Sequence, residues 1–329
     1  MNWKGKKVLV TGAGGFIGSH LVEALVEKGA KTTAYVHYNS RNDWGWIETF
    51  QDETKKKLTV IAGDIRDPEN VRKAVRGQDI LFHLASLISI PFSYEASRSY
   101  LSTNLMGAMN VVQAALEAKI ERLVHTSTSE VYGTAQYVPI DEIHSLQAQS
   151  PYSASKIGAD KIAESYFYTY GLPVGILRPF NTFGPRQSSR AIIPTIITQA
   201  LKGKEIVLGS LEPVRDFLFV GDTVRGFIKM AESPKTIGET VHIGTGSGVT
   251  IKELIAKIGR LMKRDLRVKS DRNRIRPEKS EVMRLVCDNR KAVQLMGWKP
   301  DYTLEEGLRE TIDWMTRNLK NYKTDIYNV

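Results

Sequence analysis

The fold is most constrained by a glycine-rich turn close to the N-terminus. A short apolar run, Lys7–Val10, leads directly into Gly12-x-x-Gly15-x-x-Gly18. A helical pattern then follows and stops at Gly29. A strand, such a turn and a helix together form the context of a dinucleotide site, where the backbone approaches a pyrophosphate at the helix N-terminus. A glycine triplet alone can be only a turn, but this context predicts cofactor contacts from Gly12, Gly15, Phe16, Ile17 and Gly18.

Strand-like and helical segments continue to alternate through the first half of the chain. Further strands are expected at Lys31–Tyr38, Leu58–Ala62, Asp79–Leu84, Arg122–Thr126 and Pro173–Leu177. Between them, helices are expected at Pro68–Arg76, Tyr94–Lys119 and Tyr152–Tyr170. Strands that alternate with helices indicate a parallel sheet covered on both faces. The expected fold class is therefore α/β, a Rossmann-type doubly wound parallel sheet with a smaller C-terminal α/β substrate lobe.

The alternation becomes irregular after Arg178-Pro179, where Pro, Gly and short strands are frequent. Helices are expected at Ile192–Leu201, Asp222–Glu232, Ile251–Met262 and Leu304–Asn318. We interpret residues 1–178 as a dinucleotide-binding domain, to which residues 216–245 return. Residues 179–329 are interpreted mainly as a nucleotide-sugar-binding lobe over the carboxyl ends of the strands, where open α/β sheets bind ligands.

Composition excludes several classes of protein. The single cysteine, Cys287, leaves no intrachain disulfide or Cys-based metal site and fits a reducing compartment. No apolar run approaches about 18 residues, and the N-terminus does not read as a signal peptide. The net charge of +10 is spread along the chain, with one dense stretch at Lys263–Lys279 and no nucleic-acid-binding motif. We expect a cytoplasmic protein with no metal, no nucleic-acid partner and no membrane partner.

A tyrosine and a lysine, Tyr152 and Lys156, provide the first sign of chemistry. They are four residues apart on an expected helix, so their side chains share one face. A free tyrosine has a pKa of about 10, and a nearby ammonium favours the phenolate and makes it a usable proton shuttle. The same spacing occurs by chance on many helix surfaces. Its significance comes from the glycine turn in the same chain.

The turn and the Tyr-Lys pair together resemble the extended short-chain dehydrogenase/reductase family, over nearly the whole chain. The resemblance implies that Lys156 binds the nicotinamide ribose and keeps the pKa of Tyr152 low. It also implies cofactor contacts at the ends of two strands, from Asp64 and Ile65 and from Ala85 in the segment His83-Leu84-Ala85. Further matches are Asn104, Arg178-Pro179-Phe180-Asn181 and Arg215-Asp216-Phe217.

The chain departs from this family at the end of the second strand. An acidic residue is expected there to bind the adenosine ribose of NAD, but Tyr38 occupies the position. Loss of that carboxylate removes a repulsion against a 2′-phosphate, which Ser40 or Arg41 can bind. We therefore favour NADP, tightly bound and recycled. The alternative is that Arg41 is a solvated loop residue and the cofactor is NAD.

A carboxylate follows the fifth expected strand, in Thr126-Ser127-Thr128-Ser129-Glu130. The Thr-Ser-Glu triplet resembles nucleotide-sugar 4,6-dehydratases, particularly the GDP-mannose branch. The resemblance implies that Tyr152 takes the sugar O4 proton as hydride leaves C4, and that Glu130 removes the C5 proton. Glu130 then protonates the leaving C6 hydroxyl, which Thr128 orients, and hydride returns to C6. The alternative role of Glu130 is to cap a turn.

Residues for the nucleotide end of a substrate also follow from the resemblance. Asn181, Arg215 and Arg276 match family positions around the diphosphate or nucleotide, and Ser86 is added as a substrate contact. A structural salt bridge is the alternative for the arginines, above all for Arg276 in its charge-rich loop. His83 and Cys287 are interpreted as packing residues.

A narrower resemblance concerns residues 38–46, Tyr-Asn-Ser-Arg-Asn-Asp-Trp-Gly-Trp. They are similar to dehydratases that act on nucleotide-linked N-acetylglucosamine in nonulosonic acid pathways, although the tryptophans can also simply pack the loop. The expected substrate is UDP- or GDP-N-acetylglucosamine. There are three rival functions. A UDP-sugar decarboxylase needs a further cation for a C6 carboxylate, a 4-epimerase does not need Glu130, and the third is a non-enzymatic dinucleotide sensor.

The family also implies a homodimer through a four-helix interface within Tyr94–Lys119 and Tyr152–Tyr170.

Overall fold

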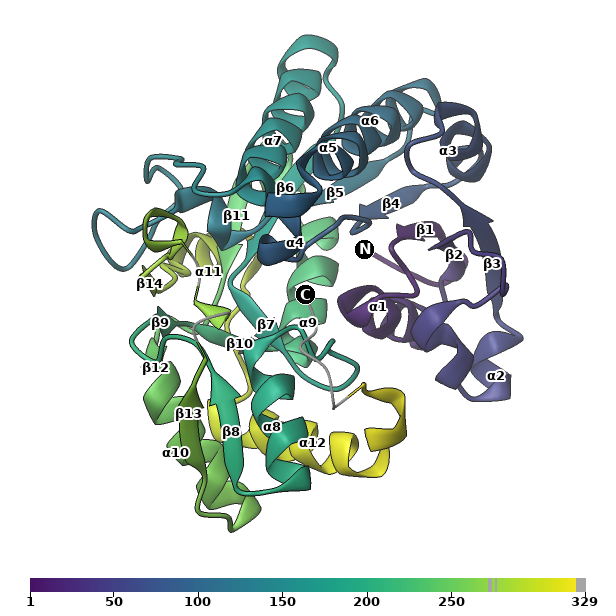
Figure 1. Cartoon of the computed structure of the whole chain (residues 1–329). Helices are drawn as coiled ribbons and strands as arrows, with labels where there is room; N and C mark the ends of the chain where they lie inside the picture. The colour runs from purple at the N-terminus through teal and green to yellow at the C-terminus, as the bar shows by residue number, and fades with distance from the viewer. Residues whose placement is uncertain (272–273, 276, 324–329) are drawn as a thin grey trace.

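A seven-stranded parallel sheet forms the centre of the molecule (Figure 1). The computed structural model describes residues 1–271, 274–275 and 277–323. The strand order β11-β6-β5-β4-β1-β2-β3 places the first strand in the interior, and every pairing is parallel. This arrangement confirms the predicted doubly wound α/β fold. The strands are β1 (Lys7–Thr11), β2 (Lys31–His37), β3 (Leu58–Gly63), β4 (Ile80–His83), β5 (Arg122–Thr126), β6 (Val174–Pro179) and β11 (Thr240–Ile243).

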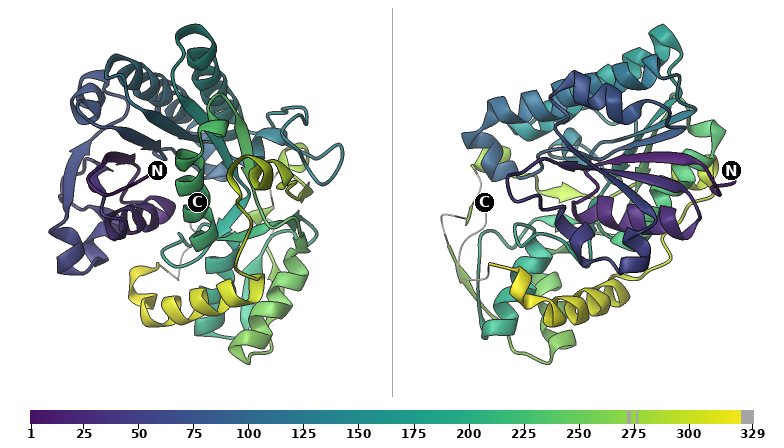
Figure 2. Two further views of the ribbon diagram at one scale, coloured as in Figure 1. Left: turned by 180° about the vertical axis from the view of Figure 1, so that it is seen from behind. Right: turned by 90° about the vertical axis from the view of Figure 1, so that its right-hand side faces the viewer.

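Helices cover both faces of this sheet because its strands are apolar on both sides. Val8 and Val10 of β1 belong to one hydrophobic cluster and Leu9 to another, as the two-residue period of a strand requires. One face packs against α3 (Pro68–Val75), α6 (Gly107–Glu117) and α7 (Pro151–Tyr170), and the other against α1 (Phe16–Glu27) and α9 (Val220–Glu232). Figure 2 shows the two layers from behind and from the side.

One predicted helix is interrupted. Instead of a continuous helix over Tyr94–Lys119, the chain forms α4 (Ile90–Glu95), α5 (Ser97–Tyr100), the π-helical turn η2 (Leu101–Met106) and then α6. The π-turn contains the buried Asn104, whose Nδ2 donates to Ser155 Oγ of α7 at 2.9 Å and to the Leu87 carbonyl at 2.9 Å. Such turns often occur at functional sites, and this one is not visible in a hydrophobic pattern of helical period.

Shorter sheets and peripheral helices build the C-terminal lobe. Paired strands are β7 (Asn181–Phe183) with β10 (Phe217–Phe219), and β8 (Glu205–Leu208) with β13 (Arg267–Ser270). A third small sheet joins β9 (Val214–Arg215), β12 (Val249–Thr250) and β14 (Arg284–Leu285). Around them lie α8 (Ile192–Lys202), α10 (Ile251–Met262) and α12 (Leu304–Arg317). Helix α11 (Arg290–Met296) packs on α9 and on β11 of the large sheet, and α2 (Asp52–Lys55) belongs to the first half of the chain.

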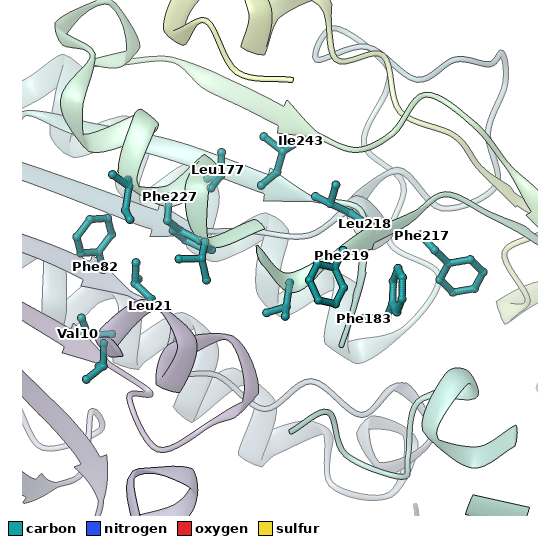
Figure 3. Packing of buried hydrophobic residues seen from close by; sticks show 14 of the residues in the cluster. Val10, Leu21, Phe82, Leu177, Phe183, Phe217, Leu218, Phe219, Phe227 and Ile243 are labelled. Atoms are coloured by element: carbon teal, nitrogen blue, oxygen red, sulfur yellow. The ribbon is translucent and has the colours of Figure 1, made fainter. Parts of the chain in front are cut away.

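A single hydrophobic cluster joins this lobe to the large sheet (Figure 3). It runs from Phe82 and Leu21 through Phe227 of α9 to Phe183 and Phe219. Residues 216–245 contribute α9 and β11, which pack on and extend the sheet. The domain boundary at residue 178 stays a prediction. No helix in the described part of the chain is long and apolar enough to cross a membrane.

The two halves also meet through polar contacts beside the glycine turn. His20 of α1 contacts the Pro185 carbonyl through Nε2 at 3.0 Å, and Arg186 pairs with Glu23 of α1 at 2.5 Å. Burial, followed by the charge of Arg186, lowers the pKa of His20 from 6.5 to about 4, although the Pro185 carbonyl opposes the shift. His20 therefore holds this contact as a neutral imidazole.

We expect acid to weaken this contact. The unfolded chain binds a proton at His20 near its ordinary pKa of 6.5, whereas the folded chain binds it only near 4. Stability is therefore lost as the pH falls through this window. Urea titrations at about pH 7 and about pH 5 measure how far the free energy of unfolding drops between the two pH values. This drop should be about 2 kcal/mol smaller in His20→Gln than in the wild type. Replacement of the exposed His37 by Gln is the control. If the free energy of unfolding drops equally in His20→Gln and in the wild type, His20 is not the group that makes this contact sensitive to acid.

Candidate active site

A cleft of about 1470 Å³ lies between the carboxyl edge of the large sheet and the C-terminal lobe. Its walls carry the glycine turn at one end, Tyr152 and Lys156 in the middle, and Arg215 with Arg274 from the second lobe. Most of the predicted site residues are thus brought to one cavity. This position agrees with the general location of ligand sites in open α/β sheets.

The glycine turn is shaped to receive a group close to its backbone. Gly12 has a φ of +70°, and a Cβ there would come within 2.8 Å of Ala85 N. A Cβ on Gly18 would come within 2.2 Å of the Gly12 carbonyl. Helix α1 begins at Phe16 after Gly15, and no side chain caps its first backbone N–H groups. Uncapped donors at a helix N-terminus suit the pyrophosphate of a dinucleotide, so the residues present fit such a cofactor.

The end of β4 is fixed to this turn by Thr11, which the sequence did not single out. Thr11 Oγ1 accepts hydrogen bonds from Leu84 N at 3.1 Å and Ala85 N at 3.2 Å, and it contacts His83 Nδ1 at 2.8 Å. Ala85 and Ser86 therefore line the cleft. Thr11 could have been predicted as a site residue, because it is the polar last residue of an otherwise apolar strand.

The predicted adenosine contacts divide into two groups. Ser40 and Arg41 line the cleft, and Asn39 orders their loop by accepting hydrogen bonds through Oδ1 from Arg41 N and Asp43 N. Tyr38 is 67% exposed and does not line the cleft. Asp64 and Ile65 also lie outside the lining: Asp64 pairs with Arg66, and Ile65 packs close to Gly107.

Tyr152 is buried in the floor of the cleft, beside Tyr100, at a ring separation of 6.2 Å. Burial raises the pKa of Tyr152 far above its ordinary value, the Glu130 charge adds to this effect, and the Thr128 hydroxyl opposes it. Thr128 Oγ1 accepts from Glu130 N at 3.2 Å, which leaves its own O–H to donate toward Tyr152. A phenolate at Tyr152 therefore depends on further positive charge or hydrogen bonds.

Lys156 does not supply that charge in the way the sequence suggested. Its Nζ donates to the Thr126 carbonyl at 2.5 Å, and a lowered pKa of Tyr152 is not found. Burial lowers the pKa of Lys156 itself to about 8, while Asp160 opposes the shift. The spacing correctly placed both side chains in one cleft, but it carried no information on burial, which dominates both pKa values.

Glu130 lines the same cleft wall, and its neighbours hold it in place. It lies in the 3₁₀ turn η3 (Ser129–Tyr132), which Thr128 caps. The following residues, Val131 and Tyr132, are fully buried. Thr128 fixes the start of the turn, and Val131 and Tyr132 anchor it in the core. The Glu130 side chain between them is partly buried at the cleft. A carboxylate in this position can exchange a proton with a ligand next to Tyr152.

A buried polar cluster behind Lys156 was missed in the sequence. Asp160 Oδ2 accepts from Ser127 Oγ at 2.6 Å and from Arg178 Nη2 at 2.9 Å, and Oδ1 lies 3.4 Å from His125 Nε2. Burial alone would raise the pKa of Asp160, but the charge of Arg178 and the contact with His125 hold it well below its usual range. Asp160 thus places a fixed negative charge beside Lys156. Its position four residues after Lys156 on one helix was the signal that could have found it.

The second lobe supplies the residues predicted for a substrate. Asn181 lines the cleft and its buried Nδ2 has no hydrogen-bond partner within the described structure. Arg215 lines it too, while its guanidinium bonds the Val214 carbonyl and lies 3.3 Å from Glu281. Arg276 lies outside the described residues. Arg190, which also lines the cleft, was missed in the sequence. It lies close to Tyr100: burial raises the pKa of Tyr100, and the charge of Arg190 opposes this shift with a smaller effect.

No group of His, Cys, Asp and Glu side chains among the described residues is arranged to hold a metal ion.

Comparisons with known proteins agree with this geometry. A family model described as "GDP-mannose 4,6 dehydratase" matches residues 9–311. The human dTDP-D-glucose 4,6-dehydratase is 30% identical over 97% of this chain and 92% of its own length. The structure of DesIV, a dTDP-glucose 4,6-dehydratase from Streptomyces venezuelae with NAD bound, is 30% identical with a TM-score of 0.85, over 96% of this chain and 98% of that chain. The UDP-N-acetylglucosamine 4-epimerase from Methanobrevibacter ruminantium is 32% identical with a TM-score of 0.87, over 96% and 99%.

Proposed function

Because the chain belongs to the family of GDP-mannose 4,6 dehydratases, we propose that it removes water from UDP- or GDP-N-acetylglucosamine. The family match confirms the prediction of an enzyme in the dehydratase branch of the extended short-chain dehydrogenases/reductases. The observation that carries the proposed reaction is the position of Glu130, which lines the cleft with Thr128 and Tyr152. An N-acetylated sugar is supported by the relative that epimerises UDP-N-acetylglucosamine and by the loop at residues 38–46.

In the proposed mechanism, Tyr152 accepts the proton of the sugar O4, and Thr128 donates a hydrogen bond to the Tyr152 oxygen. The bound dinucleotide supplies a hydride acceptor for C4 and a hydride donor for C6, so that no net redox change results. The C4 ketone acidifies the C5 proton, and Glu130 removes that proton and delivers it to the departing C6 hydroxyl, which leaves as water. When C6 receives hydride, Glu130 takes a proton from solvent and returns it to C5. Lys156 holds the nicotinamide ribose, and Asn181 and Arg215 hold the diphosphate.

NADP is the proposed cofactor, because Ser40 and Arg41 line the cleft and no carboxylate stands at Tyr38. The related DesIV structure contains NAD, which is the alternative here. Arg41→Ala should weaken NADP⁺ binding about tenfold or more and leave NAD⁺ binding nearly unchanged, because a guanidinium bonds a 2′-phosphate directly. Titration calorimetry with both dinucleotides measures this, and Arg76→Ala, an exposed arginine outside the cleft, is the control. A wild type that prefers NAD⁺ would refute the NADP assignment.

A second candidate function is a UDP-sugar decarboxylase or another enzyme of hexuronic acids. Arg190 favours it, because within the described structure its guanidinium has no hydrogen bond or ion pair while it lines the cleft near Tyr100. This is the type of cation that a C6 carboxylate requires. Glu130 is accounted for more directly by dehydration, which needs a base at C5 and an acid at C6.

One experiment separates these functions. The protein is incubated with UDP-N-acetylglucosamine, GDP-N-acetylglucosamine and UDP-glucuronate, and the products are analysed by mass spectrometry and NMR. Loss of a water mass from an N-acetylglucosamine nucleotide supports the proposal. Loss of carbon dioxide from UDP-glucuronate, or inversion at C4 without a change in mass, would assign the decarboxylase or the epimerase instead.

The proposal includes a homodimer in the cytoplasm. Leu101 and Met106 on η2 and Tyr168 on α7 are 45%, 53% and 74% exposed, and these two elements lie side by side. Burying them against a second copy would form the expected four-helix interface. Sedimentation equilibrium of the wild type tests this part, and a monomer at micromolar concentration would contradict it.

A further inference from the structure

The loop after β2 folds back onto the glycine turn. Trp46 N donates to the Gly14 carbonyl at 3.0 Å. A Cβ on Gly14 would come within 2.5 Å of the Trp44 carbonyl, and one on Gly45 within 2.5 Å of the Gly14 carbonyl. Glycine at both positions therefore allows two backbone segments to touch. Trp44 and Trp46 are consequently part of the cleft wall that faces the uncapped N-terminus of α1.

The same loop is joined to the C-terminal end of the described chain by three aromatic rings. The Trp46 ring lies 5.3 Å from that of Trp314 on α12 and 6.5 Å from that of Tyr322, and the last two rings are 6.3 Å apart. All three side chains are partly buried. Tyr322 follows the short turn η7 (Leu319–Asn321), and its hydroxyl donates to the Gln187 carbonyl at 3.0 Å. We call Trp46, Trp314 and Tyr322 the aromatic latch.

The latch borders the cleft through one of its three residues, because Trp46 lines the cleft wall whereas Trp314 and Tyr322 lie behind it. Asn321 from η7 and Gln187 from the second lobe line the cleft together with Trp46. A second set of contacts joins the same lobe to α1, where His20 contacts the Pro185 carbonyl and Glu23 pairs with Arg186. The guanidinium of Arg186 also lies over the Phe50 ring, at 5.1 Å. The second lobe is therefore joined to the first both through the latch and through α1, the helix whose N-terminus follows the glycine turn.

We propose that the aromatic latch closes the cofactor end of the cleft and makes the turn η7 part of the dinucleotide site. A dinucleotide on the glycine turn leaves only after the Trp46 contacts with Trp314 and Tyr322 open. The latch thereby holds the cofactor through successive turnovers, as a reaction without net redox change requires. This inference rests on the proposed function, because it assumes that the cleft binds a dinucleotide.

The exchange rate of bound cofactor tests the latch. Full-length protein loaded with dinucleotide is mixed with an excess of the isotopically labelled compound, and exchange is followed by mass spectrometry after rapid desalting. Trp46→Ala should exchange at least about tenfold faster than the wild type, because it loses two aromatic contacts. Trp46→Phe, which keeps an aromatic ring, should remain slow and guards against a misfolded alanine variant. Trp46→Ala/Trp314→Ala should be no faster than Trp46→Ala, since the loss of Trp46 already removes both contacts between the loop and the other two rings.

Tyr302→Ala is the matched control. Tyr302 is also a partly exposed aromatic of the second lobe, but it packs on Phe219, at 4.6 Å, outside the cleft wall. The Tyr302→Ala protein should exchange cofactor at the wild-type rate. If Trp46→Ala exchanges within about twofold of the wild type, the latch is refuted while the proposed function stands. A wild type that binds no dinucleotide at all would refute both.

Discussion

Tyr152→Phe is expected to abolish oxidation of the sugar as well as formation of the product. The variant keeps the ring and its packing on Tyr100, but it has no oxygen to accept the O4 proton. Loss of a general base of this type lowers kcat by about 10² to 10⁴-fold. Single-turnover absorbance of reduced nicotinamide measures the first step directly. Tyr137→Phe is the control, because Tyr137 is an exposed tyrosine outside the cleft.

The environment of Tyr152 makes this prediction more specific. Burial raises its pKa, and Lys156 bonds the Thr126 carbonyl. In the protein alone, Tyr152 should therefore stay protonated near neutral pH, and the positive charge of an oxidised nicotinamide would favour its phenolate. Ultraviolet difference titration of Tyr152→Phe against wild type, with and without oxidised cofactor, reports this. A Tyr152 that ionises near neutral pH in the protein alone would contradict the structural assignment.

Glu130→Gln is expected to separate oxidation from dehydration. Glutamine has nearly the same shape but cannot take the C5 proton or protonate the C6 hydroxyl. Cofactor reduction by the sugar should therefore continue, while loss of water slows by about 10² to 10⁴-fold. Rapid-quench mass spectrometry of the sugar nucleotide, together with the reduced-nicotinamide signal, follows both steps in one reaction.

A control and a second readout make the Glu130 test decisive. Glu95→Gln changes an exposed glutamate at the end of α4, outside the cleft, and should behave as wild type. In deuterated water, wild-type product should carry deuterium at C5, whereas Glu130→Gln should leave the C5 proton of the sugar in place. Wild-type water loss by Glu130→Gln would show that another group removes this proton and would remove the main support for dehydration.

Much of the fold and several candidate residues followed from local patterns. The parallel sheet, the long helix α7 and the glycine turn were predicted because apolar period, capping residues and glycine positions are properties of neighbouring residues. The π-turn at Leu101–Met106 was not predicted, because its buried Asn104 bonds Leu87 and Ser155, and contacts of this kind are absent from a local sequence pattern. Asp160 and Arg190 were also missed, since the residues that lie around them, Ser127 and Arg178 for Asp160 and Tyr100 for Arg190, are far away in the chain.

The sequence by itself determined which chemical groups are present and which of them share a turn or a helix face. That was sufficient for the glycine turn and for Tyr152 with Lys156, because backbone geometry directs side chains over a few residues. Only the tertiary structure decided how these groups behave. Burial raises the pKa of Tyr152 and lowers that of Lys156, and folding brings Trp46 against Trp314 and Tyr322. Desolvation and contacts across the chain depend on what packs around a residue, which local sequence does not encode.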